Sequence, residues 1–243
     1  PVIVTARSGS SAYGDTPADP GLSATGLVGG QDASVLTGLS NSFDLDAASA
    51  AGRYALAVAG TLANRNYVVA DRRSGTWTVT PRALVVTPDA LTRAYGEAAP
   101  ARGGASGDGL VNGDRLGDVG LLTPATAASG VGRYALTGAD ATFAAGAAGN
   151  YAITYATRGD GLTIVPRALT VSAQAQSRVY GDADPVLTYT VGGRGLVDGD
   201  GLSGRLATTA TAGSGVGTYA ITQGSLAASA NYALTYQGAD LAV

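Results

Sequence analysis

One short element occurs three times in this chain, and it constrains the fold more than any other feature of the sequence. Each copy joins a tyrosine and a glycine to an acidic residue and a following proline. The copies are SAYGDTPADP with Tyr13 and Gly14, TRAYGEAAP with Tyr95 and Gly96, and SRVYGDADP with Tyr180 and Gly181. A catalytic motif usually occurs once in a chain, whereas a structural unit recurs, so this element predicts an internal repeat.

Four further landmarks recur in the same order around this element. They are a proline (Pro1, Pro81, Pro166), a Gly-Leu-Val triplet (from Gly26, Gly109 and Gly195), a Gly-x-Tyr-Ala segment (with Tyr54, Tyr134 and Tyr219) and an Asn-Tyr pair (from Asn66, Asn150 and Asn231). Landmarks that recur together at one spacing indicate copies of one supersecondary unit. The sequence therefore predicts three tandem domains, residues 1–80, 81–165 and 166–243.

Apolar and polar residues alternate within each unit. In VLTYTV, for example, Leu187, Tyr189 and Val191 share one face, and threonines occupy the other. Glycine, asparagine, aspartate and proline separate such runs, as expected of turns between short strands. The pattern predicts about six or seven strands per unit and an all-β fold, with three small β-sandwiches of immunoglobulin-like type joined in a rod.

Two details bear on the topology of each unit. The Gly-x-Tyr segment resembles in its spacing the tyrosine corner of immunoglobulin-like domains, in which a buried tyrosine bonds nearby backbone through its hydroxyl. Tyr54, Tyr134 and Tyr219 are expected in that role and largely buried. A β-grasp-like unit is the alternative, if GLVDGDGL and its equivalents form a helical turn.

The prolines lie where the last strand of one unit meets the first strand of the next, as in TVT-Pro81-RALVV and TIV-Pro166-RALTV. Proline cannot donate a hydrogen bond to a sheet and has a fixed φ angle, so it interrupts strand pairing and leaves a stiff joint. The expected partners of each unit are therefore the neighbouring repeats of the same longer chain.

Composition excludes several classes of function. Lysine is absent, the arginines are scattered and the net charge is −3, so no nucleic-acid-binding surface is expected. No apolar run is long enough for membrane insertion. Without histidine or cysteine the chain lacks the commonest general base and a thiolate, so we expect no enzymatic activity and no cofactor. The absence of methionine indicates a processed product or an excised segment.

Two sets of polar residues are candidates for binding sites. The Tyr-Gly-Asp/Glu element could place an aromatic ring and a carboxylate against a sugar, but a core tyrosine beside a glycine turn explains the same residues. Asp114, Asp198 and Asp200, in VNGDRLGD and VDGDGLSG, are candidate calcium ligands. The same Asn-Gly and Asp-Gly pairs are strong turn signals, and only Asp32 remains of this set in the first unit.

Taken in order, the landmarks resemble those of the MBG-type repeat (YGX type). The third unit matches best, the second has Glu97 where the others have aspartate, and the first reads Gly-Gly-Gln-Asp after its Gly-Leu-Val triplet. Such repeats occur in tandem in very large bacterial surface proteins, including filamentous-haemagglutinin-like adhesins. The resemblance implies export, an extracellular location at the surface of a Gram-negative cell, and no catalytic residues.

The resemblance and the tandem organisation together favour a structural role, in which the chain is a semi-rigid stalk or spacer of an adhesin or fibre. Two alternatives stay open. One is an adhesive module that binds carbohydrate or mucin, with host or surface glycans as partners. The other is a subunit that self-associates into a filament through exposed strand edges.

Overall fold

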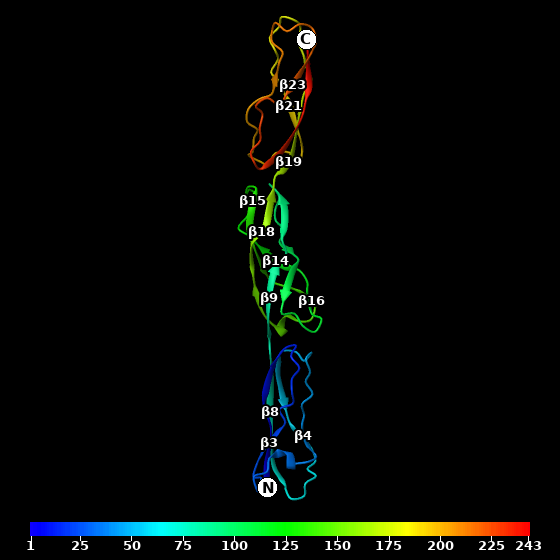
Figure 1. Cartoon of the computed structure of the whole chain (residues 1–243), viewed down its shortest axis with the longest axis vertical. Coiled ribbons are helices and arrows are strands. Elements are labelled where there is room, and N and C mark those ends of the chain that lie inside the picture. The colour runs from blue at the N-terminus through cyan, green and yellow to red at the C-terminus, as the bar shows by residue number, and fades with distance from the viewer. The chain divides into compact units, whose positions relative to one another are not determined.

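The computed structural model describes all residues from Pro1 to Val243. The chain is built from β-strands (Figure 1), with two short 3-10 helices, η1 (Ala33–Val35) and η2 (Ala148–Asn150). The predicted all-β class is therefore confirmed. Neither helix has the length or the apolar character needed to cross a membrane.

The strands are distributed unequally over the three repeats. The first repeat has eight: β1 (Val2–Ala6), β2 (Gly9–Ala12), β3 (Leu22–Thr25), β4 (Leu39–Asn41), β5 (Gly52–Leu56), β6 (Val58–Gly60), β7 (Val69–Arg73) and β8 (Gly75–Thr80). The second has ten: β9 (Arg82–Pro88), β10 (Leu91–Ala94), β11 (Arg102–Gly103), β12 (Ala105–Asp108), β13 (Arg115–Leu116), β14 (Val119–Leu122), β15 (Gly132–Ala139), β16 (Phe143–Ala145), β17 (Tyr151–Tyr155) and β18 (Thr157–Val165). The third has seven: β19 (Arg167–Ala173), β20 (Gln176–Ser177), β21 (Tyr189–Gly193), β22 (Ala207–Thr208), β23 (Thr218–Thr222), β24 (Tyr232–Gln237) and β25 (Ala239–Ala242).

Each repeat contains two main sheets, which we name proximal and distal. The proximal sheet holds the strand that follows the opening proline, and its strand orders are β3-β1-β7, β12-β9-β17 and β21-β19-β24. The distal sheet holds the last strand of the repeat, and its orders are β2-β8-β5, β10-β18-β15-β14-β11 and β20-β25-β23-β22. The additional pairs β4-β6 and β13-β16 are among the eight and ten strands of the first two repeats, which exceed the predicted six or seven.

Parallel pairing joins the beginning and the end of each repeat. The first strand of each proximal sheet is antiparallel to one neighbour and parallel to the strand of the Asn-Tyr pair, as in β19 with β21 and β24. In the distal sheets β2, β10 and β20 are parallel to the last strand of their repeat. The repeats are therefore mixed β structures, a feature that the alternation of residues did not predict.

The Gly-Leu-Val segments form tight turns. The N–H groups of Gln31, Asp114 and Asp200 donate to the carbonyls of Val28, Val111 and Val197, three residues earlier. No helix forms at these segments in the second and third repeats, whereas in the first the 3-10 helix η1 begins at Ala33, where the segment ends. The helical turn that the β-grasp alternative required is therefore present only as this short 3-10 helix in the first repeat.

Pro81 and Pro166 stand between strands of different sheets. β8 ends at Thr80 in the distal sheet of the first repeat, and β9 begins at Arg82 in the proximal sheet of the second. β18 and β19 are related in the same way around Pro166. Because proline has no N–H, one ladder ends there and the chain enters the next sheet.

The chain divides into two compact units, and their boundary falls inside the second repeat. Unit 1 contains Pro1–Asp89, Arg102–Gly120 and Gly138–Ala156, and unit 2 contains Ala90–Ala101, Leu121–Thr137 and Thr157–Val243. Unit 1 therefore holds the first repeat with the proximal half of the second, and unit 2 holds the distal half of the second with the third. Each unit contains one complete junction between successive repeats.

Candidate functional site at the junctions between repeats

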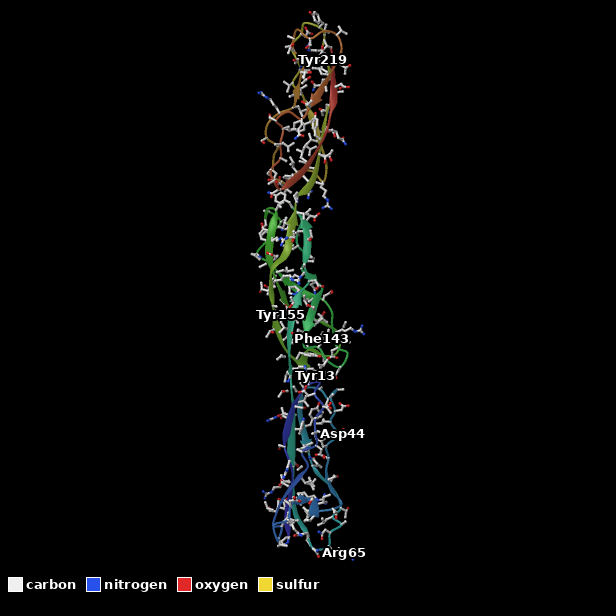
Figure 2. The ribbon with its side chains drawn as sticks, in the orientation of Figure 1. Tyr13, Asp44, Arg65, Phe143, Tyr155 and Tyr219 are labelled. Carbon is white, nitrogen blue, oxygen red and sulfur yellow. The ribbon has the colours of Figure 1, made fainter.

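The residues that recur in the sequence gather at these two junctions, where the distal face of one repeat meets the proximal face of the next. The distal face consists of the Tyr-Gly turn and the loop before the Gly-x-Tyr strand. The proximal face consists of the residue after the proline, the Gly-Leu-Val turn and the Asn-Tyr pair. Figure 2 labels Tyr13 on the distal face of the first repeat and Phe143 in the proximal half of the second.

The Tyr-Gly element is a β-turn in all three repeats. The N–H groups of Asp15, Glu97 and Asp182 donate to the carbonyls of Ala12, Ala94 and Val179, three residues earlier. The glycines have φ angles of +85° at Gly14, +80° at Gly96 and +90° at Gly181. A type II turn needs such a positive φ at its third residue, which explains why glycine follows each tyrosine.

The Gly-x-Tyr tyrosines fasten the loop of the distal face. The hydroxyls of Tyr54, Tyr134 and Tyr219 donate to the carbonyls of Ala50, Gly130 and Gly215, over 2.8, 2.9 and 3.0 Å. This is the hydrogen bond of a tyrosine corner. The three rings are half-buried rather than largely buried, because the loops that they bind lie at the surface.

Two tyrosine rings and one carboxylate meet at the first junction. Tyr13 of the first repeat packs edge-on against Tyr151 of the second, with ring centroids 5.5 Å apart and ring planes at 84°. Both hydroxyls donate to Asp114 Oδ2, over 3.0 Å from Tyr13 and 2.7 Å from Tyr151. The Phe143 ring stacks on the Tyr151 ring, with ring centroids 5.5 Å apart and ring planes at 18°. Edge-to-face packing with satisfied hydroxyls is a favourable way to bury two tyrosines.

The backbone beside Tyr13 is also engaged by the second repeat. A Cβ atom on Gly14 would lie 2.5 Å from Val111 Cγ2, so only a glycine allows this approach. Arg82 donates through Nη1 to the Tyr13 carbonyl (3.2 Å) and to the Asp15 carboxylate (2.9 Å). Arginine is suited to this position because its guanidinium has several donors and is always charged.

The second junction repeats the arrangement. Tyr95 packs edge-on against Tyr232, with ring centroids 5.5 Å apart and ring planes at 81°. The Tyr232 hydroxyl donates to the Asp200 carboxylate. A Cβ atom on Gly96 would lie 2.3 Å from Val197 Cγ2. The same residue types therefore close both junctions.

Charged groups surround the second junction as well. Arg167 donates through Nη1 to the Tyr95 carbonyl (3.4 Å) and through Nε to the Gly195 carbonyl (2.9 Å). Glu97 and Arg194 add an ion pair between the two repeats. Because that pair is partly exposed, it contributes little to stability compared with the buried tyrosines.

The hydrophobic core continues through the second junction. Tyr95, Leu162 and Ile164 of the second repeat form one buried cluster with Leu169 and Tyr232 of the third. The cluster includes residues on both sides of Pro166, so the two repeats share buried surface there. A junction of this kind resists bending more than a solvated linker does, because bending it would expose apolar area.

The asparagine of each Asn-Tyr pair binds the opposite loop. Asn150 Oδ1 accepts from the Ala51 N–H, and Asn231 Oδ1 accepts from the Val131 N–H, each over 2.9 Å. Ala51 and Val131 directly follow the residues whose carbonyls the corner tyrosines bind. The tyrosine corner thus holds the loop in the position at which the next repeat binds it.

Replacing Asn231 with alanine is expected to destabilise the second junction by about 1 kcal/mol, because the Val131 N–H loses its acceptor. Hydrogen exchange at the Val131 amide measures the effect. Asn66→Ala is the matched control, since Asn66 has the same place in the first repeat and its side chain is exposed. An equal loss of stability in the two variants would show that the hydrogen bond between Asn231 and the Val131 N–H does not stabilise the junction.

Burial raises the pKa of the junction tyrosines. For Tyr151 it raises the pKa to about 12; hydrogen bonding from the Val111 backbone opposes the shift, and the Asp114 carboxylate adds to it. Burial is also the main cause of the raised pKa of Tyr95 and of Tyr232, and Asp200 adds to both. A phenol that ionises less readily in the folded state stabilises the fold below its unfolded pKa.

The free energy of unfolding is therefore expected to fall between pH 10 and about 12, where Tyr151 ionises in the unfolded chain before it ionises in the folded one. Urea unfolding at a series of pH values measures this loss. The Tyr151→Phe variant keeps the ring and lacks the titrating group, so its stability should decline less over the same range. An identical decline in both proteins would count against a raised Tyr151 pKa.

The aspartates considered for calcium have other partners. Asp114 and Asp200 accept hydrogen bonds from tyrosine hydroxyls, and Asp198 is exposed. The structure contains no group of three or more acidic, histidine or cysteine side chains that could hold a metal ion. Asp114 and Asp200 thus belong to the junctions.

The junction roles of several residues were not predicted from the sequence. Arg82 and Arg167 were not singled out, and Val111, Val197, Asn150 and Asn231 were recognised only as parts of recurring landmarks. Each recurs at a fixed offset from a landmark, and that recurrence was the available signal. It did not distinguish contacts within a repeat from contacts between repeats.

An all-β chain of three like domains, whose recurring residues make the contacts between successive domains, is a tandem-repeat protein. The MBG domain (YGX type) matches residues 2–78, 84–162 and 169–242. The chain belongs to this family, and the resemblance noted in its sequence is confirmed. A search of curated proteins found no match. MBG domains of this type are repeat modules typical of surface proteins.

Proposed function

We propose that this chain is an extracellular segment of a bacterial surface adhesin or fibre and that it acts as a semi-rigid stalk, with no catalytic role. The observation that carries the proposal is that both junctions are closed by the same buried tyrosine pair, glycine–valine contact and asparagine hydrogen bond. A spacer needs neighbouring domains to hold a fixed orientation. Two features support such a fixed orientation. One proline alone separates the last strand of a repeat from the first strand of the next, and the hydrophobic core is continuous through the second junction.

Deleting residues 81–165 tests the proposal. In the shortened chain Tyr13 should pack against Tyr232, because the proximal face of the third repeat carries the same arginine, aspartate and asparagine as that of the second. Small-angle X-ray scattering should show a maximum dimension shorter by one repeat, with the remaining junction still ordered. A broad distribution of dimensions for the full chain, as for beads on a flexible string, would refute the stalk.

Carbohydrate binding is the second candidate, and one feature of the first repeat favours it. A surface hollow there is lined by Ser42, Asp44 and Tyr54, which combine hydroxyl, carboxylate and aromatic groups (Asp44 is labelled in Figure 2). Glycan-array binding that disappears in Asp44→Ala would support an adhesive role. The absence of saturable binding to glycans or mucin would leave the stalk as the function.

A further inference from the structure

A buried arginine of the second repeat has no carboxylate beside it. Arg93 lies on β10 and is 6% exposed. Its Nη1 donates to the Ala94 carbonyl and its Nη2 to the Thr126 carbonyl, whereas its Nε is buried and has no acceptor. Arg93 takes part in none of the ion pairs of the chain. A buried charge that is not compensated is strongly unfavourable, so this guanidinium is an unusual feature of the fold.

The third repeat contains the same guanidinium with a partner. Arg178 has the place of Arg93, two residues before the tyrosine of the Tyr-Gly element, and its side chain is 3% exposed. Its Nη1 and Nη2 donate to the carbonyls of Val179 and Thr211, which correspond to the two acceptors in the second repeat. Its Nε donates to the Asp184 carboxylate over 2.6 Å, and the two side chains form an ion pair.

The second repeat has an alanine at the position of that aspartate. Ala99 and Asp184 each stand between an alanine and a proline, four residues after the tyrosine of the Tyr-Gly element. The nearby Glu97 does not replace the aspartate, because its carboxylate accepts from the Ala94 N–H and pairs with Arg194. The second repeat therefore presents a donor and a positive charge for which its own side chains supply no carboxylate.

We propose that the second repeat binds a small carboxylate anion, of the size of formate or acetate, at the Arg93 Nε–H, in the place that the Asp184 carboxylate has in the third repeat. An alanine lacks only the carboxylate group of an aspartate, and formate is that group alone. A guanidinium suits such a ligand, because its hydrogen bonds to carboxylates are charge-assisted. The Asp184 side chain is 28% exposed, so the corresponding place in the third repeat is open to solvent.

Binding at this site would stabilise the loop that the second junction uses. Arg93 holds the Thr126 carbonyl, and Thr126 begins the turn that leads to Gly130 and Val131. Val131 is the residue whose N–H binds Asn231 of the third repeat. The inference goes beyond the proposed stalk, because it makes the stability of unit 2 depend on a dissolved anion, and it holds whether or not the chain is a stalk.

Titration of the full chain, with isotope-labelled arginine, tests the site directly by NMR. Sodium formate replaces sodium gluconate at constant ionic strength, because gluconate has the same charge but is too bulky for a place of this size. The Arg93 Nε–H resonance is expected to shift and to saturate as it gains an acceptor. The Arg178 Nε–H resonance should stay in place, because it already has the Asp184 carboxylate. The absence of a saturable shift at Arg93 overturns the proposal.

Two substitutions exchange the properties of the two repeats. Ala99→Asp should supply the carboxylate from within the chain and abolish the response of Arg93 to formate. Asp184→Ala should give Arg178 the response that Arg93 has in the original chain. If the Arg178 resonance of Asp184→Ala does not respond, the correspondence between the two sites is wrong.

Stability provides an independent readout through hydrogen exchange at the Leu162 amide of unit 2. A ligand that binds only the folded chain lowers the unfolding equilibrium constant, by about tenfold when its concentration is ten times its Kd. The original chain should show this protection in formate relative to gluconate, and Ala99→Asp should not. Equal protection in both proteins would be a general effect of the salt and would overturn the site. A larger response to chloride than to formate would overturn the choice of a carboxylate as ligand.

Discussion

Replacing Gly96 with valine is expected to destabilise unit 2 by roughly 2–5 kcal/mol, because two costs add. Gly96 has a φ of +80°, a conformation that costs a residue with a Cβ atom about 1–2 kcal/mol. The new Cβ would lie 2.3 Å from Val197 Cγ2, and overpacking of this kind costs about 1–3 kcal/mol. Hydrogen exchange at the buried Leu162 and Leu169 amides, on either side of the junction, measures the loss.

Gly181→Val is the matched control for this prediction. Gly181 occupies the same turn with a φ of +90°, but no atom lies within 4 Å of its Cβ position. Only the backbone cost of about 1–2 kcal/mol should remain in that variant. If the two substitutions destabilised the chain equally, the contact between Gly96 and Val197 would contribute nothing to the junction.

The alternation of residues was sufficient to predict the strands and their buried faces. Leu169 and Val171 of β19 alternate with half-buried residues, as a period of two requires. The glycines of the Tyr-Gly turns could likewise be predicted, because a tight turn needs a positive φ angle that glycine adopts without strain.

The direction of strand pairing could not be predicted in this way. Alternation fixes which side chains share a face of a strand, and it is the same in parallel and antiparallel ladders. β19 has an antiparallel partner on one edge and a parallel partner on the other, and nothing in its residues distinguishes the two. The choice depends on the chain connections, through which the Asn-Tyr strand returns beside the opening strand.

The role of the Tyr-Gly tyrosines was only half predicted. Tyr13 and Tyr95 are buried, as expected of core tyrosines, but the rings that cover them belong to the following repeat. One buried cluster likewise includes residues of both the second and the third repeat, on either side of Pro166. All copies of a repeat have similar sequence neighbours, so a sequence alone does not tell whether a contact lies within a unit or between two. The exposed Tyr180 reveals the difference.

Replacing Tyr95 with alanine is expected to destabilise unit 2 by about 3–5 kcal/mol, the range for removing a large buried aromatic ring. Tyr95 belongs to the cluster shared by the second and third repeats and makes an edge-on contact with Tyr232. Its loss leaves a cavity at the junction and exposes apolar area on both sides of it. Denaturant unfolding, followed by hydrogen exchange at Leu169, measures the change.

The matched variant Tyr180→Ala removes the same side chain from the same turn and should change stability by less than about 0.5 kcal/mol, because Tyr180 is exposed. Tyr95→Phe keeps the ring and its edge-on contact with Tyr232 and should cost only about 1 kcal/mol, because the hydroxyl alone is removed. The loss of stability should be largest in Tyr95→Ala, smaller in Tyr95→Phe and smallest in Tyr180→Ala. This order is expected only if the following repeat covers the tyrosine. A large loss in Tyr180→Ala would instead place these tyrosines in the core of their own repeat, and the junctions would no longer account for the recurrence of the motif.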